Sequence, residues 1–154
     1  MPPFVAKRML NALYLPEGTE WLIRYIEVLN PIRFKPDRIS GARRERRAVV
    51  LDEVAYVIGA DLGGVTADDV DHHTFLDAAV SNNSSVHLGL ASFPGTVRLL
   101  EANEQNDVVF NPIMHDLGWM LLEIRNDKTK LPSFFRAQMR NGRVSLSEDL
   151  VIAI

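Results

Sequence analysis

The sequence predicts one α+β domain with a small C-terminal β extension, and three observations support this fold class. The chain has 154 residues, close to the usual size of a single domain. Hydrophobic residues make up 47% and charged residues 24%, which is typical of a globular chain and excludes a disordered, collagen-like or coiled-coil protein. Segments with helical and strand-like periodicity follow one another along the chain, and this mixture indicates the α+β class.

The first elements are a helix and a strand. A short helix is expected up to Tyr14, because apolar residues recur near helical spacing and Pro16 and Gly18 follow as a stop signal. Residues 21–29 are rich in β-branched and aromatic side chains and predict a strand. The Asn30-Pro31 pair ends it.

An arginine-rich loop is expected next, over residues 33–47. Residues 48–60 then predict a second long strand with a bulge at residues 52–53, and Gly63-Gly64 predicts a turn. A second helix is expected from Thr66, where the hydroxyl and a carboxylate three residues later resemble a capping box.

Further strands complete the chain. Residues 86–100 carry strand-like residues interrupted by glycine and proline, and two apolar runs follow at residues 119–124 and 133–139. Asn141-Gly142 is a strong hairpin signal. The order matches a ferredoxin-like core that lacks its first strand, with the core over residues 1–100 and the C-terminal β extension packed on it over residues 101–154. Without that strand, we expect an open sheet edge that a partner strand, self-association or a rearranged sheet would cover.

The charge distribution is uneven. The chain carries −3 overall, yet the segment from Arg33 to Arg47 holds seven basic and two acidic residues, so its net charge is +5 and the remainder carries −8. A basic patch with six arginines indicates a polyanion such as RNA, because the guanidinium group makes bidentate bonds to phosphate. A solvated charged loop is the alternative. The candidate RNA-binding residues are Arg33, Lys35, Arg38, Arg43, Arg44, Arg46 and Arg47.

Several classes of site are excluded by composition. The chain has no cysteine, which excludes disulfides, thiolate metal sites and a cysteine nucleophile. No apolar run approaches the ~18 residues of a membrane span. The N-terminus has two prolines and early charges in place of a signal-peptide core, so we expect a cytoplasmic protein with no membrane partner.

Seven blocks of sequence, in order along almost the whole chain, resemble one family. They are residues 2–14 (PPFVAKRMLNALY), Trp21, residues 28–34 (VLNPIRF), residues 46–48 with 54–58, residues 88–89 with 93–94, residues 116–124 (DLGWMLLEI), and residues 134–137 with 141–142. In these blocks the chain resembles the CRISPR-associated Cas-five family of the RAMP superfamily in its type I-C (Dvulg) form, shortened at the N-terminus.

This resemblance implies an RNA-binding subunit of a CRISPR surveillance complex (Cascade), which serves antiviral defence. Such a subunit holds the 5′ handle of the guide RNA, contacts other subunits of the complex, and in type I-C systems cleaves precursor CRISPR RNA without a metal or cofactor. Family members have a ferredoxin-like core and a small C-terminal β region.

The resemblance also implies catalytic residues. The family's tyrosine at the end of the first helix corresponds to Tyr14, its histidine to His73, and its lysine position is occupied by His72. Cations that the family carries after this pair are replaced, since an arginine pair appears as Ala78 and Ala79 and a later arginine as Ala91 or Ser92. These losses would weaken guide-RNA contacts.

Metal-independent RNA cleavage uses the 2′-hydroxyl as nucleophile and leaves a 2′,3′-cyclic phosphate and a 5′-hydroxyl. It needs a base, an acid and a cation near the phosphate. Tyr14 could orient or deprotonate the hydroxyl, His73 could serve as acid or base, and His72 could supply the cation when protonated.

Other interpretations of these residues stay open. The histidine pair can be a solvated helix start, helped by neighbouring aspartates, and a metal site is disfavoured because the spacing is not a standard ligand set. The chain could also be a non-catalytic subunit that only docks RNA and neighbouring proteins. A third alternative is an unrelated small α+β domain with an arginine-rich loop.

Overall fold

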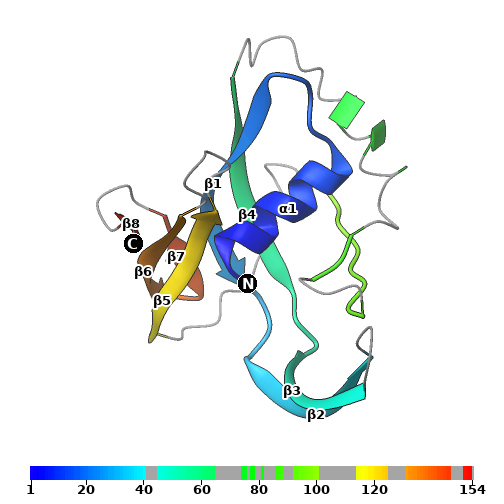
Figure 1. Cartoon of the computed structure of the whole chain (residues 1–154), viewed down its shortest axis with the longest axis vertical. Helices are drawn as coiled ribbons and strands as arrows, with labels where there is room; N and C mark the ends of the chain where they lie inside the picture. The colour runs from blue at the N-terminus through cyan, green and yellow to red at the C-terminus, as the bar shows by residue number, and fades with distance from the viewer. Residues whose placement is uncertain are drawn as a thin grey trace.

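A computed structural model describes residues 1–40, 45–64, 74–75, 77–78, 81, 86–88, 92–100, 114–124, 131–146 and 151–153 (Figure 1). The named elements of these residues are one helix and eight strands. They are α1 (Pro3–Leu13), β1 (Thr19–Val28), β2 (Arg33–Ser40), β3 (Glu45–Asp52), β4 (Tyr56–Gly64), β5 (His115–Ile124), β6 (Pro132–Arg140), β7 (Arg143–Ser145) and β8 (Val151–Ala153).

The strands form two antiparallel sheets. The larger has the order β4-β1-β7-β6-β5, with β8 added to β6, and the smaller is the β2–β3 hairpin. Strand β7 pairs with both β1 and β6, so the C-terminal strands continue the sheet that β1 and β4 begin. The mostly antiparallel sheet with a helix confirms the α+β class.

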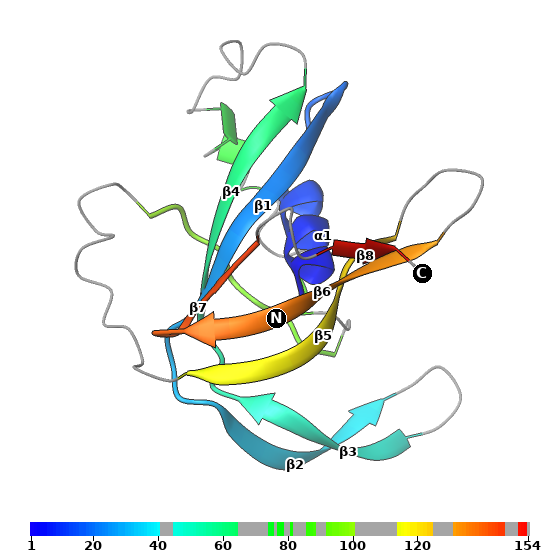
Figure 2. The same ribbon diagram turned by 90° about the vertical axis from the view of Figure 1, so that its left-hand side faces the viewer.

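Helix α1 covers one face of β1 and β4 (Figures 1 and 2). Pro3 stands in its first turn, where the missing N–H costs nothing. Its buried face presents Met9, Leu10 and Leu13 to Val86 and to strand residues that include Trp21, Ile23, Ile58 and Ala60. The spacing of these helix residues matches the helical repeat, so the predicted helix up to Tyr14 is confirmed.

A second core lies on the C-terminal strands. Phe135, Ala137 and Met139 are buried at every second position of β6, and Val144 of β7 joins them. This alternation is the period of a strand with one covered face. The predicted hairpin between these strands is confirmed, because Asn141 and Gly142 have φ values of 51° and 78°. A two-residue turn with both φ values positive suits the right-handed twist of the strands.

The structure corrects three expectations for residues 33–64, since the expected turn at Gly63-Gly64 is also part of a strand. Most of the expected arginine-rich loop is strand, since β2 and β3 form a regular hairpin. The expected long strand over residues 48–60 is two strands in different sheets, separated at Glu53, which has a φ of 48°. The chain turns there without a glycine, proline or asparagine to mark the turn. Gly63 and Gly64 extend β4 and pair with Glu20 and Thr19.

The expected strand-like segment over residues 86–100 forms no named strand in its described residues, 86–88 and 92–100. They close on each other through the His87–Pro94 bridge, with the Leu88 amide donating to the Phe93 carbonyl at 2.8 Å. Most of the expected second helix lies outside the described residues. Among the helices of the described residues, none is long and apolar enough to cross a membrane.

Candidate functional site

Tyr14 follows the last turn of α1 and is fixed through its backbone and its ring. Its amide donates to the Leu10 carbonyl at 2.9 Å, and its own carbonyl accepts a hydrogen bond from the Trp21 indole Nε1 at 2.8 Å. Its side chain is partly buried. The helix end and the start of β1 therefore hold Tyr14 in one position.

Phe75 completes an aromatic cluster with Tyr14 and Trp21. The Phe75 ring lies edge-on to both, with centroid separations of 5.9 Å from Tyr14 and 5.5 Å from Trp21. Edge-to-face pairs at such separations are favourable by about 1 kcal/mol beyond the area they bury. The segment that contains Phe75 is thereby anchored at the end of α1.

His72 and His73 lie outside the described residues, so the structure gives them no position. They precede Phe75 by three and two positions in the sequence. Ala78, at one position of the replaced arginine pair, is partly buried, and Ser92 is exposed; Ala79 and Ala91 are outside the described residues. Of the three predicted catalytic residues, the structure places Tyr14 alone.

Five of the seven predicted RNA-binding residues lie on the β2–β3 hairpin, which stands apart from the larger sheet at one end of the molecule (Figures 1 and 2). Arg38 and Arg47 are directly paired across the two strands, and both are exposed. Residues paired in this way share a face, with Cβ atoms roughly 5 Å apart. Two arginines on one face place two guanidinium groups side by side, an arrangement that suits a phosphate group.

Arg33 and Lys35 alternate with this pair along β2 and so lie on the opposite face of the hairpin. The Lys35 ammonium contacts the Asp52 carboxylate at 2.6 Å, and the Arg33 guanidinium lies 3.5 Å from Glu53. The hydrogen bond to Asp52 raises the pKa of Lys35. This face therefore carries balanced charge, and its exposed ion pairs are easily exchanged for other partners.

The face that carries Arg38 and Arg47 continues as an apolar surface that the sequence did not reveal. Phe34 is paired with Leu51, and Pro36 with Val49, on the same side as the arginines. Phe34 is 67% and Val49 71% exposed. An apolar alternation at residues 34, 49 and 51 could have indicated this surface, if residues 33–47 had been predicted as a strand rather than a loop.

The other predicted basic residues are only partly placed. Arg46 pairs with Ile39 near the end of the hairpin, but its side chain is not described. Arg43 and Arg44 lie outside the described residues. The C-terminal end of α1 and the hairpin lie at different levels along the long axis (Figures 1 and 2), so an RNA touching both must span that separation.

Comparison with known proteins identifies similar chains. No family model matches the sequence. A CRISPR pre-crRNA endoribonuclease, Cas5d of Mannheimia succiniciproducens, is 27% identical over 183 aligned positions, which cover 94% of this chain and 81% of the relative.

Two crystal structures have a similar fold. One, of a CRISPR-associated protein, superposes with a TM-score of 0.71 at 18% identity, covering 96% of this chain and 82% of the other. The second, of a functionally uncharacterized protein from Streptococcus mutans, gives a TM-score of 0.69 at 15% identity with the same coverage. In sequence this chain thus resembles Cas5d, and in fold it resembles a CRISPR-associated protein, which supports the resemblance to the CRISPR-associated Cas5 family.

Proposed function

We propose that this chain is an RNA-binding subunit of a type I-C-like CRISPR surveillance complex. In this role it holds the 5′ handle of the guide RNA and cleaves precursor CRISPR RNA in the cytoplasm. The observation that carries the RNA-binding part is the Arg38–Arg47 pair on an exposed hairpin. The similarity to a pre-crRNA endoribonuclease supports the choice of RNA.

The hairpin face combines the two features that single-stranded RNA requires. Arg38 and Arg47 supply charge for phosphates, and the exposed ring of Phe34 offers a surface on which a base can stack. Arg46, near the hairpin end, would extend the charged part, as would Arg43 and Arg44, which fall between β2 and β3 in the sequence. The opposite face, with Arg33 and Lys35 paired to acids, would contribute less.

The cleavage proposal rests on the end of α1. Contact between the Tyr14 and Phe75 rings fixes a point of the chain two positions after His73 beside the tyrosine. We assign the orientation of the 2′-hydroxyl to Tyr14, proton transfer to His73, and the cationic role to protonated His72. The three residues would thus supply orientation, proton transfer and positive charge, and the proposed reaction requires no metal or cofactor.

The direct test is incubation of the purified chain with its own CRISPR repeat RNA in EDTA. We expect one cut, leaving a 2′,3′-cyclic phosphate on the upstream fragment and a 5′-hydroxyl on the downstream fragment. Specific binding without a cut would leave the non-catalytic docking subunit as the function. Failure to prefer the repeat over a scrambled RNA of the same length would contradict the RNA-binding proposal itself.

A further inference from the structure

Strands β5, β6 and β7 have a buried face and an outer face. Phe135 of β6 lines a small pocket together with Pro3 and Lys7 of α1, so the buried face of these strands points toward the helix. Residues that alternate with the buried ones along β6 point the opposite way, away from α1. Figure 2 views the strands from this outer side. The exposed β6 residues on the outer face are Arg136, Gln138 and Arg140.

Trp119 is exposed on this face beside Arg136. The two residues are direct partners across β5 and β6, so their side chains share the outer face with Cβ atoms roughly 5 Å apart. Trp119 is 52% exposed, although tryptophan is usually well buried. Strand β5 is irregular just before it, because the register shifts between Asp116 and Gly118, and Gly118 has a φ of 74°. Bulges of this kind re-aim side chains, and here the next residue carries the exposed indole ring.

Arg136 is held beside Trp119 by Asp116. Its Nε donates to Asp116 Oδ1 at 3.1 Å and its Nη2 donates to Oδ2, while the same Oδ1 accepts a hydrogen bond from the Gly118 amide at 2.9 Å. One carboxylate therefore fixes both the bulge and the guanidinium group. The guanidinium has further N–H donors that these two bonds leave available. Its exposed pair with Asp116 can also be exchanged for a phosphate, which accepts bidentate bonds in the same way.

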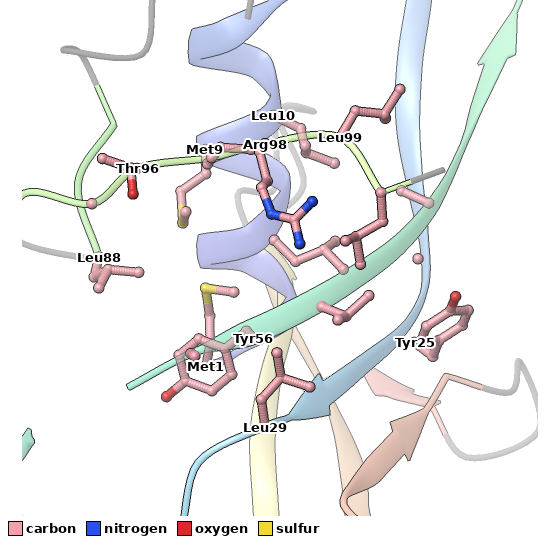
Figure 3. A pocket seen from close by; sticks show the side chains of 18 of the residues that line it. Met1, Met9, Leu10, Tyr25, Leu29, Tyr56, Leu88, Thr96, Arg98 and Leu99 are labelled. Carbon is pink, nitrogen blue, oxygen red and sulfur yellow. The ribbon is translucent and has the colours of Figure 1, made fainter. Parts of the chain in front are cut away.

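Arg143 of β7 is the direct cross-strand partner of Arg140 and so shares the outer face. Its Nε donates to the Glu27 carboxylate at 2.5 Å, and its guanidinium lies 4.3 Å from the Tyr25 ring centroid. The Tyr25 ring projects from the side of the sheet away from α1 (Figure 3) and lies against Gly59, where any Cβ would overlap the ring. The glycine thus leaves room for Tyr25, and the tyrosine in turn supports the arginine.

The charges on this face favour an anion. Asp116 pairs with Arg136 and Glu27 pairs with Arg143, so neither carboxylate is left to repel a phosphate. Arg140 contacts the Gln138 side-chain oxygen at 3.3 Å and forms no ion pair within the described residues. The three arginines therefore outnumber the two acids bound to them, although the chain as a whole carries −3.

We propose that the outer face of β5, β6 and β7 binds a single-stranded segment of RNA, as a second contact apart from the β2–β3 hairpin. An unpaired base stacks on the Trp119 indole, and Arg136 and Arg140 bind neighbouring phosphates. Gln138 lies between these two arginines and offers an amide for hydrogen bonding. The choice of RNA rests on the proposed function, whereas the site itself uses no residue of the hairpin.

Two other occupants suit this face less well. The cores of protein interfaces are depleted of charged residues, whereas Trp119 stands directly beside the ion pair of Arg136 with Asp116. A double-stranded RNA keeps its bases paired and stacked on one another, so it offers no free base to an exposed indole ring. A single strand has both the unpaired bases and the phosphates that this combination of side chains can bind.

The fluorescence of Trp119 provides the first test. The chain has two tryptophans, so Trp21→Phe leaves Trp119 as the only one. The probe is single-stranded oligouridylate, and the controls are the same strand in a duplex with oligoadenylate and heparin, which carries charge but no bases. We expect the single strand to quench Trp119 saturably and both controls to quench it much less. No quenching by the single strand, or equal quenching by heparin, would overturn the proposal.

Affinity measurements test the stacking with Trp21 in place. They use the Arg38→Ala, Arg47→Ala chain, in which the hairpin contributes little. Trp119→Ala should weaken oligouridylate binding about fivefold or more, the usual loss for one stacked base, and Trp119→Phe should recover most of it because it keeps a ring. Leu131→Ala, which removes an exposed apolar side chain outside the proposed site, is the control. Equal affinities for Trp119→Ala and Leu131→Ala would contradict the stacking.

Exchanging the arginine variants distinguishes the two RNA contacts. Trp119 should still be quenched in the Arg38→Ala, Arg47→Ala chain, and it should lose most of its quenching when Arg136 and Arg140 are replaced by alanine. The reverse pattern would overturn this second contact and leave the hairpin as the RNA site. Quenching that depends on Arg136 and Arg140, in a chain whose hairpin variant binds repeat RNA as wild type does, would support the outer face and contradict the hairpin.

Discussion

Tyr14 is held by its backbone and by its ring, so the role of its hydroxyl can be tested separately from the packing. Tyr14→Phe keeps the ring beside Phe75 and the backbone bonds to Leu10 and Trp21. If the hydroxyl orients the nucleophile, this variant loses cleavage of repeat RNA at an unchanged melting temperature. Tyr56→Phe is the matched control, since it removes a phenol hydroxyl at β4, and it should cleave normally. Equal activity in Tyr14→Phe and wild type would remove Tyr14 from the mechanism.

The histidine pair predicts a particular pH dependence. His73→Ala should slow cleavage about 100-fold or more, the usual contribution of a positioned acid or base. His72 must be protonated to act as a cation, so wild-type cleavage should decline above the histidine range. His72→Lys carries its charge to higher pH and should raise the rate above pH 7. A rate profile that His72→Lys leaves unchanged would show that His72 supplies no charge.

The amino group of Met1 predicts a pH dependence of stability. Burial lowers its pKa from 8.0 to about 6. Between these values the unfolded chain binds more protons than the folded chain, so the free energy of unfolding rises with pH from about 6 to 8. Two pKa units correspond to at most about 2.7 kcal/mol. Urea unfolding at several pH values in this range measures how the free energy of unfolding changes with pH. The mass of the protein used should first verify that Met1 is present.

N-terminal acetylation provides the control for this slope, because it removes the titrating group. The difference between the free and acetylated chains isolates the amine from histidines that titrate in the same range. Identical slopes for the two chains would show that burial does not oppose protonation of Met1.

At the scale of elements, the join between β1 and β7 depends on an ion pair between a buried carboxylate and a half-exposed arginine. Glu27 of β1 is 3% exposed, and Arg143 of β7, its direct cross-strand partner, donates to its carboxylate from Nε at 2.5 Å. The Arg143 guanidinium also lies 4.3 Å from the Tyr25 ring centroid. One arginine thus ties the C-terminal strands to the first strand of the sheet.

Removal of Arg143 would leave the Glu27 carboxylate buried without its partner. We expect Arg143→Leu to lower the free energy of unfolding by about 2 kcal/mol, less than for a fully buried pair, because Arg143 itself is half exposed. Adding Glu27→Gln should restore part of the loss. Arg136→Leu breaks the exposed pair with Asp116 and should cost less than about 1 kcal/mol. Denaturant unfolding that gave the two single variants equal losses would contradict this account.

The elements also show what the sequence could predict. The helix before Tyr14, the strand over 21–29 and the Asn141-Gly142 hairpin each carry a strong local signal, and all three are confirmed. The turn at Glu53 carries no such signal, because its positive φ falls on a glutamate and not on the glycine or asparagine that usually marks such a turn. Because the turn was not predicted, β3 and β4 were predicted as one strand. The β2–β3 hairpin, and the face that Phe34 shares with Arg47, could therefore not be predicted.

Across the whole molecule, two cores are joined by strand pairing and by one lysine. The cluster under α1 and the cluster on β6 meet through β1, which pairs with both β4 and β7. Lys7 of α1 spans this join, contacting Glu20 of β1 at 3.1 Å and Glu123 of β5 at 3.0 Å. Burial opposes its charge, but the two hydrogen bonds raise the pKa of Lys7 overall, so the bridge persists at neutral pH.

The candidate site could be predicted only in part, because its geometry depends on contacts between residues far apart in the sequence. The basic composition of residues 33–47 was visible in the sequence, but the pairing of Arg38 with Arg47 depends on a register that only the folded hairpin defines. Likewise, the contact of Tyr14 with Phe75 joins residues 61 positions apart, which no local pattern encodes.

The salt dependence of repeat-RNA affinity tests the central claim most directly. In single-stranded RNA each neutralised phosphate contributes about 0.7 to the slope of log affinity against log salt, so Arg38→Ala with Arg47→Ala should reduce the slope by about 1.4. The matched control, Arg33→Ala with Lys35→Ala, removes the same charge from the opposite face and should reduce it less. If wild type and both variants bind with the same slope, the hairpin is not the RNA contact and the account is contradicted.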